Sequence, residues 1–182
     1  MGTDKAFLLY KGRPFVAVIA EEMLKVAGDV LVVIGNKDGS SFRRVLDDRI
    51  RVIADSYYLT NPIGGMLSTF REVRNEYVAF VACDVPLMKS DVISFLHDAA
   101  RGHSAAVPRW ENGHVEPLCA VYNVQQSEEA GLKAFDRGNL SCAHLVGELQ
   151  DVNFVPVEEL RRLEPSLGFL RNVNRREDLL AL

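Results

Sequence analysis

The chain has 182 residues and a formal net charge of −4 at pH 7, and hydrophobic residues make up 48% of it. This length and composition favour one domain over residues 1–182, with a core large enough to need no disulfide or metal staple. The acidic balance argues against nucleic acid as a partner, since non-specific binding needs a basic surface, and no apolar run approaches the roughly 18 residues of a membrane span.

Strands and helices alternate in the first part of the chain. Apolar residues recur at helical spacing after Pro14, which suits the first position of a helix, and Gly28 is expected to end that helix. Ser90 is expected to cap a later one. The elements predicted here are, in order, a helix over 15–27, a strand over 30–34, a short helix over 42–46, a strand over 50–54, a helix over 66–73, a strand over 78–82 and a helix over 91–100.

The later part of the chain departs from this alternation. Two extended runs, 105–109 and 115–122, flank Asn112-Gly113, and Asn-Gly between extended runs is a strong signal of a β-hairpin. The pattern predicts a three-layer α/β domain, with a mostly parallel sheet and an antiparallel hairpin addition. The remaining predicted elements are a helix over 128–135, a helix that ends at Leu149, a strand over 152–157 and a closing helix over 176–182.

The stretch 78–87 is the most informative one in the sequence. Its first half is an apolar run typical of a strand buried on both faces, and Asp84 follows that run, two residues before Pro86. Ligands of open α/β sheets bind beyond the carboxyl ends of the strands, and a carboxylate there can hold Mg²⁺, which takes oxygen ligands including phosphates. The alternative is that Asp84 caps the following turn, because Asp-x-Pro also opens turns.

Three further features point to the same edge of the sheet. Asp55 ends another strand that is predicted to be parallel, so its side chain and that of Asp84 are expected on one rim. The pair Gly64–Gly65 opens a helix, and free amides at a helix start favour an anion. Lys5 lies in a Gly/Thr/Asp/Lys segment and suits a phosphate as a point charge. Alternatively, the glycines fit a tight loop and the lysine is a solvated surface residue.

No protein nucleophile and no transition-metal site are predicted. Cys83, Cys119 and Cys142 lie in or next to apolar segments without a Cys-x-x-Cys spacing, so we expect buried free thiols in a reducing, cytoplasmic compartment. The four histidines show no metal-ligand spacing, and neither Gly-x-Ser-x-Gly nor a Walker motif occurs. The acidic start of the chain is a poor signal peptide.

Six short segments, in their order and spacing, resemble the motifs of the molybdenum cofactor guanylyltransferases. They are Met1–Ala6, Asp55–Ser56, Pro62–Met66, Cys83–Pro86, Glu116–Tyr122 and Asn172–Asn174. The resemblance runs from the start of the chain to near its end. It implies a three-layer, Rossmann-like nucleotidyltransferase fold.

The resemblance also implies a reaction, the transfer of GMP from Mg-GTP to the terminal phosphate of molybdopterin or its molybdenum form, with release of pyrophosphate. By position, the family's roles fall on Lys5 for the nucleotide phosphates, on Asp55, Gly64 and Gly65 for GTP, on Asp84 for Mg²⁺, on Asn172 and Asn174 for the pterin side, and on Lys5 and Asp84 as catalytic residues. Such chemistry needs positioning and charge neutralisation, and the attacking phosphate is already ionised, so no strong general base is required.

Other functions stay open within this interpretation. A cytidylyltransferase that acts on the same cofactor and a sugar-phosphate nucleotidyltransferase share the fold, and the segment Glu116–Leu118 favours the guanylyl enzyme over both. A non-catalytic relative that binds the cofactor and delivers it is a further alternative, and it needs no magnesium site at Asp84. The resemblance also implies transient contact with other cofactor-biosynthesis proteins or with molybdoenzymes.

The family further has a strand and a glycine-rich loop ahead of the segment that corresponds to Met1–Ala6, and the sequence holds neither. The first strand of a doubly wound sheet is central. We therefore expect its neighbours to carry unpaired amides at its place, and the phosphates to lack a cradle of backbone amides. Weak binding of GTP by this chain is the expected consequence.

Overall fold

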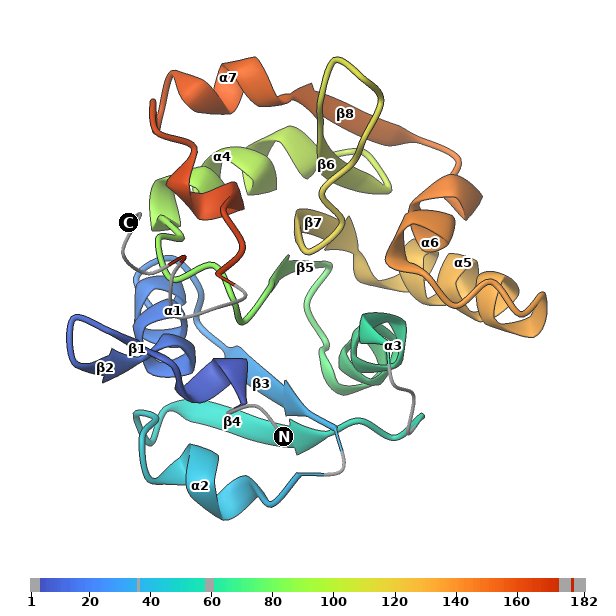
Figure 1. The fold of residues 1–182 in the computed structure, drawn as a ribbon. Helices are drawn as coiled ribbons and strands as arrows, with labels where there is room; N and C mark the ends of the chain where they lie inside the picture. Colours follow the sequence, from blue (N-terminus) through green and yellow to red (C-terminus); the bar gives the residue numbers. More distant parts are fainter. Residues whose placement is uncertain (1–3, 36, 58–60, 174–177, 179–182) are drawn as a thin grey trace.

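The computed structural model describes residues 4–35, 37–57, 61–173 and 178, and Figure 1 shows their arrangement. The helix predicted over 176–182 falls, except for Asp178, outside them. The elements are, in chain order, η1 (Lys5–Phe7), β1 (Leu9–Tyr10), β2 (Arg13–Pro14), α1 (Phe15–Met23), β3 (Val30–Ile34), α2 (Gly39–Arg43), β4 (Ile50–Ala54), α3 (Pro62–Glu72), β5 (Tyr77–Val81), α4 (Ser90–Ala100), β6 (Ala105–Arg109), β7 (Cys119–Asn123), α5 (Val124–Asp136), α6 (Cys142–Glu148), β8 (Val152–Pro156), α7 (Val157–Arg161) and η2 (Gly168–Leu170).

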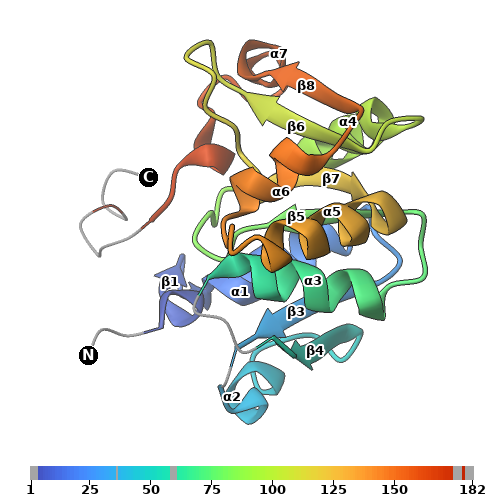
Figure 2. The same ribbon diagram turned by 90° about the vertical axis from the view of Figure 1, so that its right-hand side faces the viewer.

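The middle layer of the molecule consists of two sheets. One has two parallel strands, β3 and β4, which pair from Val30 with Ile50 to Ile34 with Ala54. The other has four strands in the order β5-β7-β6-β8, in which β6 and β8 are parallel and β7 is antiparallel to both of its neighbours. Figure 2 shows these strands stacked in the order β4, β3, β5, β7, β6, β8. The predicted α/β fold class is confirmed, but the strands of this layer are mixed in direction and not mostly parallel.

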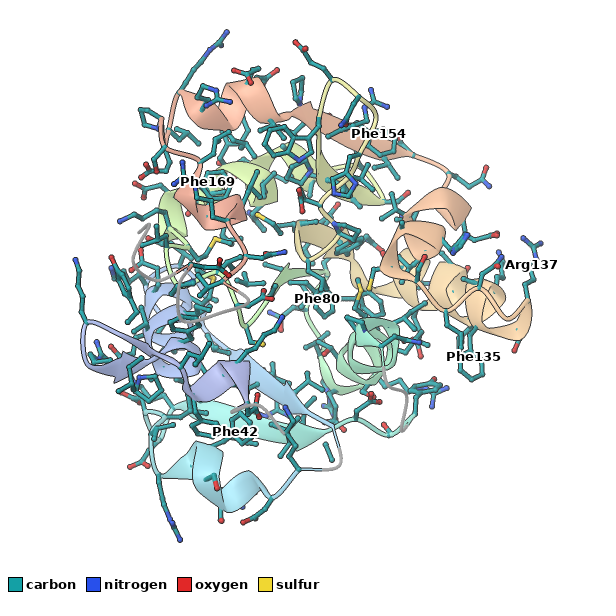
Figure 3. The ribbon with its side chains drawn as sticks, in the orientation of Figure 1. Phe42, Phe80, Phe135, Arg137, Phe154 and Phe169 are labelled. Carbon is teal, nitrogen blue, oxygen red and sulfur yellow. The ribbon has the colours of Figure 1, made fainter. Side chains whose placement is uncertain are left out.

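Helices cover both faces of this layer, so the core has two parts. Helices α1 and α4 cover one face, and α3, α5 and α6 cover the other (Figure 2). On the second face, Phe70 of α3, Phe80 of β5 and Tyr122 of β7 form an aromatic cluster with ring centroids 5.4–6.3 Å apart. Figure 3 shows Phe80 near the centre of the molecule. None of the helices in the described residues is long and apolar enough to cross a membrane.

The predicted hairpin is confirmed and explains the mixed sheet. β6 and β7 pair antiparallel, with Ala105 opposite Tyr122. In the connecting loop, Gly113 takes a φ of +86°, and its N–H donates to the Trp110 carbonyl at 2.9 Å. This left-handed backbone conformation favours glycine, as the Asn-Gly signal indicates.

The strand before Asp84 differs from the prediction in its pairing and its burial. The sequence predicts a parallel strand buried on both faces, but β5 pairs antiparallel with β7, and each of its residues stays at least partly accessible. The hairpin is the reason, because β7 returns beside β6 and lies between β6 and β5. The other edge of β5 has no partner strand in the part of the chain that is described.

Three helices of the first part have other boundaries than predicted, and the short one, α2, covers Gly39–Arg43 instead of 42–46. Helix α1 ends at Met23 instead of near Gly28, because the N–H groups of both Val26 and Ala27 bond to the Met23 carbonyl and close the last turn. Helix α3 begins at Pro62, so the predicted glycine pair lies inside its first turn. Proline fits that position because its missing N–H leaves no intrahelical bond unmade.

The start of α4 is capped by a side chain from another helix. Ser90 is the first residue of α4 and not its cap, and the side chain of Lys89 at the N-cap position makes no capping hydrogen bond. Instead, Glu22 of α1 accepts hydrogen bonds from the Ser90 N–H at 3.0 Å and the Ser90 hydroxyl at 2.9 Å, and it pairs with Lys25. Burial raises the pKa of the Glu22 carboxyl, but the bonds from Lys25 and Ser90 outweigh it, so this pKa lies below its usual range.

We expect Glu22→Ala to lower the free energy of unfolding by about 1–3 kcal/mol, because it leaves buried donors without their charged acceptor. The control Glu21→Ala removes a more exposed glutamate that pairs with Arg13, and should cost less than about 1 kcal/mol. Because folding lowers the pKa of Glu22, its contribution to stability is present at pH values above the pKa of an ordinary solvated glutamate and is lost as the pH falls through the lower folded-state pKa. Denaturant unfolding over a pH series measures this, and equal losses in the two variants would contradict the cap.

Candidate active site

The carboxyl ends of three strands meet at one rim. Lys37 follows β3 by three residues, Asp55 follows β4 directly, and Asp84 follows β5 by three residues. All three line one cavity of about 950 Å³, whose walls also include residues of α1, α3 and α4. The prediction that Asp55 and Asp84 share a rim is therefore confirmed.

Two lysine–aspartate pairs bring charge to this rim. Lys5 Nζ lies 3.3 Å from Asp84 Oδ2, and Lys37 Nζ lies 2.7 Å from Asp4 Oδ2. Asp4 also caps η1, where its Oδ1 accepts from the Ala6 N–H at 3.2 Å. The segment 4–5 thus contacts the ends of β3 and β5 together. The two lysine side chains are 44% and 53% exposed, within reach of a ligand in the cavity.

The Asp84 carboxylate is available to a cation. No backbone N–H of the described residues donates to it, so the alternative that it caps the following turn finds no support. Its own carbonyl accepts from the Val173 N–H at 2.8 Å, which fixes the backbone there. The described residues hold no group of three or more His, Cys, Asp and Glu side chains that would bind a metal. A single carboxylate suits Mg²⁺ when phosphates and water supply the other oxygen ligands, and the role of Asp84 as that carboxylate stays a prediction.

Asp55 lies at the rim, but its carboxylate is engaged by other residues of the chain. It is 5% exposed, and its Oδ1 accepts from the Tyr57 N–H at 2.8 Å and from the Ser68 hydroxyl at 3.0 Å. Its Oδ2 lies against Gly64, where an added Cβ would come within 2.5 Å. These contacts join the end of β4 to α3. The contact of Asp55 with GTP stays a prediction.

The two glycines of α3 have different surroundings. Gly64 is buried against Asp55, whereas Gly65 lines the cavity, and a Cβ there would meet Val33 at an ordinary 3.5 Å. The first turn of α3 leaves N–H groups without intrahelical partners beside cavity-lining Asn61. This arrangement suits an anion, and the role of the pair in GTP binding stays a prediction.

Of the two asparagines predicted to lie near the pterin, the structure describes one. Asn172 is exposed, and the next residue, Val173, bonds to the backbone of Asp84, so this segment passes beside the end of β5. Asn174 lies outside the described residues. A place for either near a pterin stays a prediction.

The cysteines only partly follow the prediction. Cys119 and Cys142 are buried and free, but Cys83 is exposed, because it lies in the turn after β5 at the wall of the cavity. Partial desolvation and the charges of Asp84 and Asp4 raise the pKa of the Cys83 thiol, so it is protonated at neutral pH. It is therefore poorly suited to act as a nucleophile.

Lys37 is a rim residue that was not predicted from the sequence. Its loop, 35–39, reads as an ordinary polar connection. One feature of the sequence could have indicated Lys37: it lies three residues after the end of its strand, as Asp84 does. On the hairpin, Glu116 is also engaged, since its Oε1 accepts from Trp110 Nε1 at 2.8 Å and lies 3.6 Å from His114 Nε2.

The fold and this rim define a nucleotidyltransferase. The MobA-like NTP transferase domain matches residues 1–152, and the chain belongs to that family. It is 35% identical over 181 residues to a probable molybdenum cofactor guanylyltransferase of Methanosarcina mazei, covering 97% of this chain and 80% of the relative. It is 34% identical over 186 residues to one of Methanothermobacter thermautotrophicus, covering 98% and 90%.

Solved structures show the same fold. Molybdopterin-guanine dinucleotide biosynthesis protein A of Archaeoglobus fulgidus superposes with a TM-score of 0.79 at 21% identity, over 99% of this chain and 89% of that one. The 2-C-methyl-D-erythritol 4-phosphate cytidylyltransferase of Thermus thermophilus superposes with a TM-score of 0.70 at 16% identity, over 97% and 91%. At these identities the likeness concerns the fold alone.

Proposed function

We propose that this chain transfers GMP from GTP to the terminal phosphate of molybdopterin or its molybdenum form, with release of pyrophosphate. The observation that carries the proposal is the pairing of Lys5 with Asp84 at the end of β5, where Asp84 lines the same cavity as Lys37. The relatives named probable molybdenum cofactor guanylyltransferases, matched over nearly the whole chain, support this choice of substrates.

Asp84 is the residue that would hold Mg²⁺ together with the phosphates of bound GTP. When bound, the ion supplies positive charge that neutralises the phosphates during transfer. Asp84 contributes position as well as charge, because the backbone bond from Val173 and the contact with Lys5 keep its side chain, 16% exposed, at the cavity wall.

Lys5 and Lys37 supply the positive charge that the chain itself brings to the phosphates. Both occupy the rim, and both side chains are about half exposed. A lysine binds phosphate as a point charge and needs no fixed geometry. Two such charges suit the triphosphate of the substrate and the pyrophosphate that leaves.

The chain needs no nucleophile of its own for this reaction. The acceptor phosphate forms a bond to the α-phosphorus of GTP while the bond from that phosphorus to the pyrophosphate oxygen breaks. The acceptor is ionised at pH 7, so no general base has to remove a proton. The protonated Cys83 thiol, the cysteine of this cavity wall, agrees with such a direct transfer.

Cytidylyl transfer is the second candidate. This chain shares its fold with a cytidylyltransferase. Rim residues that hold only phosphates and a cation would not distinguish guanine from cytosine. The nucleotide base that this chain prefers must therefore be identified by comparing the binding of GTP and CTP.

We expect GTP to stabilise the protein more than CTP does, and only with Mg²⁺ present. A ligand at 100 times its Kd raises the free energy of unfolding by about 2.7 kcal/mol, which corresponds to about 5–10 °C in Tm for a domain of this size. Thermal unfolding with each nucleotide, with Mg²⁺ or with EDTA, measures the shifts. An equal or larger shift with CTP would favour the cytidylyltransferase.

A further inference from the structure

Residues 167–173 pack against the turn that carries Asp84. The Val173 N–H donates to the Asp84 carbonyl at 2.8 Å, and Val173 is 1% exposed. Figure 1 shows this segment, in red, beside the green connection from β5 to α4. The bond holds the backbone of the residue whose carboxylate is predicted to bind the cation. We call residues 167–173 the clamp segment.

A second contact, between Gly168 and Leu87, joins the clamp segment to the same turn. Leu87 lies three residues after Asp84, and Gly168 is buried against its side chain. A Cβ at residue 168 would lie 2.7 Å from Leu87 Cδ1 and 3.3 Å from Leu87 Cβ, so the two segments are packed too closely for an added methyl group. The turn is therefore held at Asp84 by a hydrogen bond and at Leu87 by packing.

Buried side chains fix the clamp segment in place. Leu167 and Phe169 are buried, in the same part of the core as Val85 and Met88 of the turn. Leu167 takes a φ of +48°, a left-handed conformation that is unfavourable for a residue with a side chain. Such a conformation persists only where the surrounding structure determines it, and ligand-binding sites are enriched in it. The packing of the clamp segment thus outweighs a local cost in its backbone.

A bound Mg²⁺ would make the position of the Asp84 carboxylate critical. Mg²⁺ requires nearly octahedral ligands at about 2.0–2.1 Å, and a functional side chain has to be held within about 0.5 Å of its working position. The contact of Asp84 with Lys5 is a weak restraint by itself, because the lysine side chain is 44% exposed. The backbone of the turn must therefore supply most of the positioning.

We propose that the clamp segment positions Asp84 for Mg²⁺. This inference rests on the proposed function, in which Asp84 holds the ion. Gly168 acts through Leu87, and Val173 acts through its bond to the Asp84 carbonyl. Neither Gly168 nor Val173 is among the residues that line the cavity, so both are positioning residues and not ligands.

The test compares two variants that disturb the contact from opposite sides. Gly168→Ala overfills it and Leu87→Ala empties it, so both should displace Asp84. In each, we expect the Mg²⁺ concentration for half-maximal GMP transfer, and that for half of the thermal stabilisation by GTP, to rise about 10-fold. The Val173 amide should exchange with solvent about 10-fold faster, and this readout needs no activity. Leu87 is only partly buried, so Leu87→Ala tests the contact even if Gly168→Ala does not fold.

Gly131→Ala is the matched control. A Cβ at residue 131 would lie 2.8 Å from Leu67 Cδ2, where α5 packs on α3 in the other part of the core. This variant should lose about as much stability as Gly168→Ala, since both overfill a contact with a leucine. Its Mg²⁺ requirement and its exchange at Val173 should stay at the parent values.

The outcomes separate this inference from the proposed function. If the parent transfers GMP and the Mg²⁺ requirement is unchanged in both Gly168→Ala and Leu87→Ala, the clamp is overturned and the proposed function stands. An equal rise in Gly131→Ala would assign the effect to lost stability, and would also overturn the clamp. A parent chain without Mg²⁺-dependent transfer would overturn the proposed function itself.

Discussion

Asp84→Asn is expected to fold normally and to lose at least about 100-fold in kcat/KM for GMP transfer. The substitution keeps the shape of the side chain and removes the charge that would hold Mg²⁺, and the charge stabilisation supplied by a bound metal is worth several kcal/mol in the transition state. Stability should change by less than about 1 kcal/mol, because the substitution weakens an ion pair with Lys5, whose side chain is 44% exposed. The backbone bond between Val173 and Asp84 remains.

The matched control is Asp48→Asn, which changes the net charge equally at an exposed position in the loop before β4. Initial rates over a Mg²⁺ titration, with thermal unfolding of both variants, separate the effects. The variant of Asp84 should need more Mg²⁺ and stay slow at saturation, while the control should follow the parent. A parent rate in Asp84→Asn would reduce Asp84 to a turn residue and remove the main support for the proposed mechanism.

Strand boundaries and the hairpin turn could be predicted from the sequence, because they depend on residues close together in the chain. The apolar runs over 30–34 and 50–54 become β3 and β4 with those boundaries, and Asn112-Gly113 becomes the turn of a hairpin. The placement of Asp55 and Asp84 on one rim also follows from sequence, because strand direction alone decides it.

Contacts between distant segments account for what local signals miss. The partner of β5 depends on where the hairpin inserts, which the run 78–82 does not encode. The cap of α4 comes from Glu22, on another helix, and no spacing near Ser90 indicates it. Lys37 becomes a rim residue only when the ends of β3 and β5 are placed together.

The contact between Gly64 and Asp55 is of the same non-local kind, and it predicts opposite effects for two neighbouring substitutions. Gly64→Ala is expected to lower the free energy of unfolding by about 1–3 kcal/mol, the usual cost of overpacking. The new Cβ would lie 2.5 Å from Asp55 Oδ2, and this carboxylate cannot easily move, because Tyr57 and Ser68 hold it. Gly65→Ala should instead stabilise by up to about 1 kcal/mol through helix propensity, since its Cβ meets only Val33 at 3.5 Å.

Denaturant unfolding of the two variants measures this difference, and a double-mutant cycle assigns it to one contact. In an Asp55→Ala background the carboxylate is gone, so Gly64→Ala should no longer destabilise and should approach the effect of Gly65→Ala. The coupling between residues 55 and 64 is then at least as large as the loss that Gly64→Ala causes in the parent, and it exceeds that loss by any gain seen in the Asp55→Ala background. An equal loss in both backgrounds would show that the backbone of α3 at this position, and not its packing on Asp55, requires glycine.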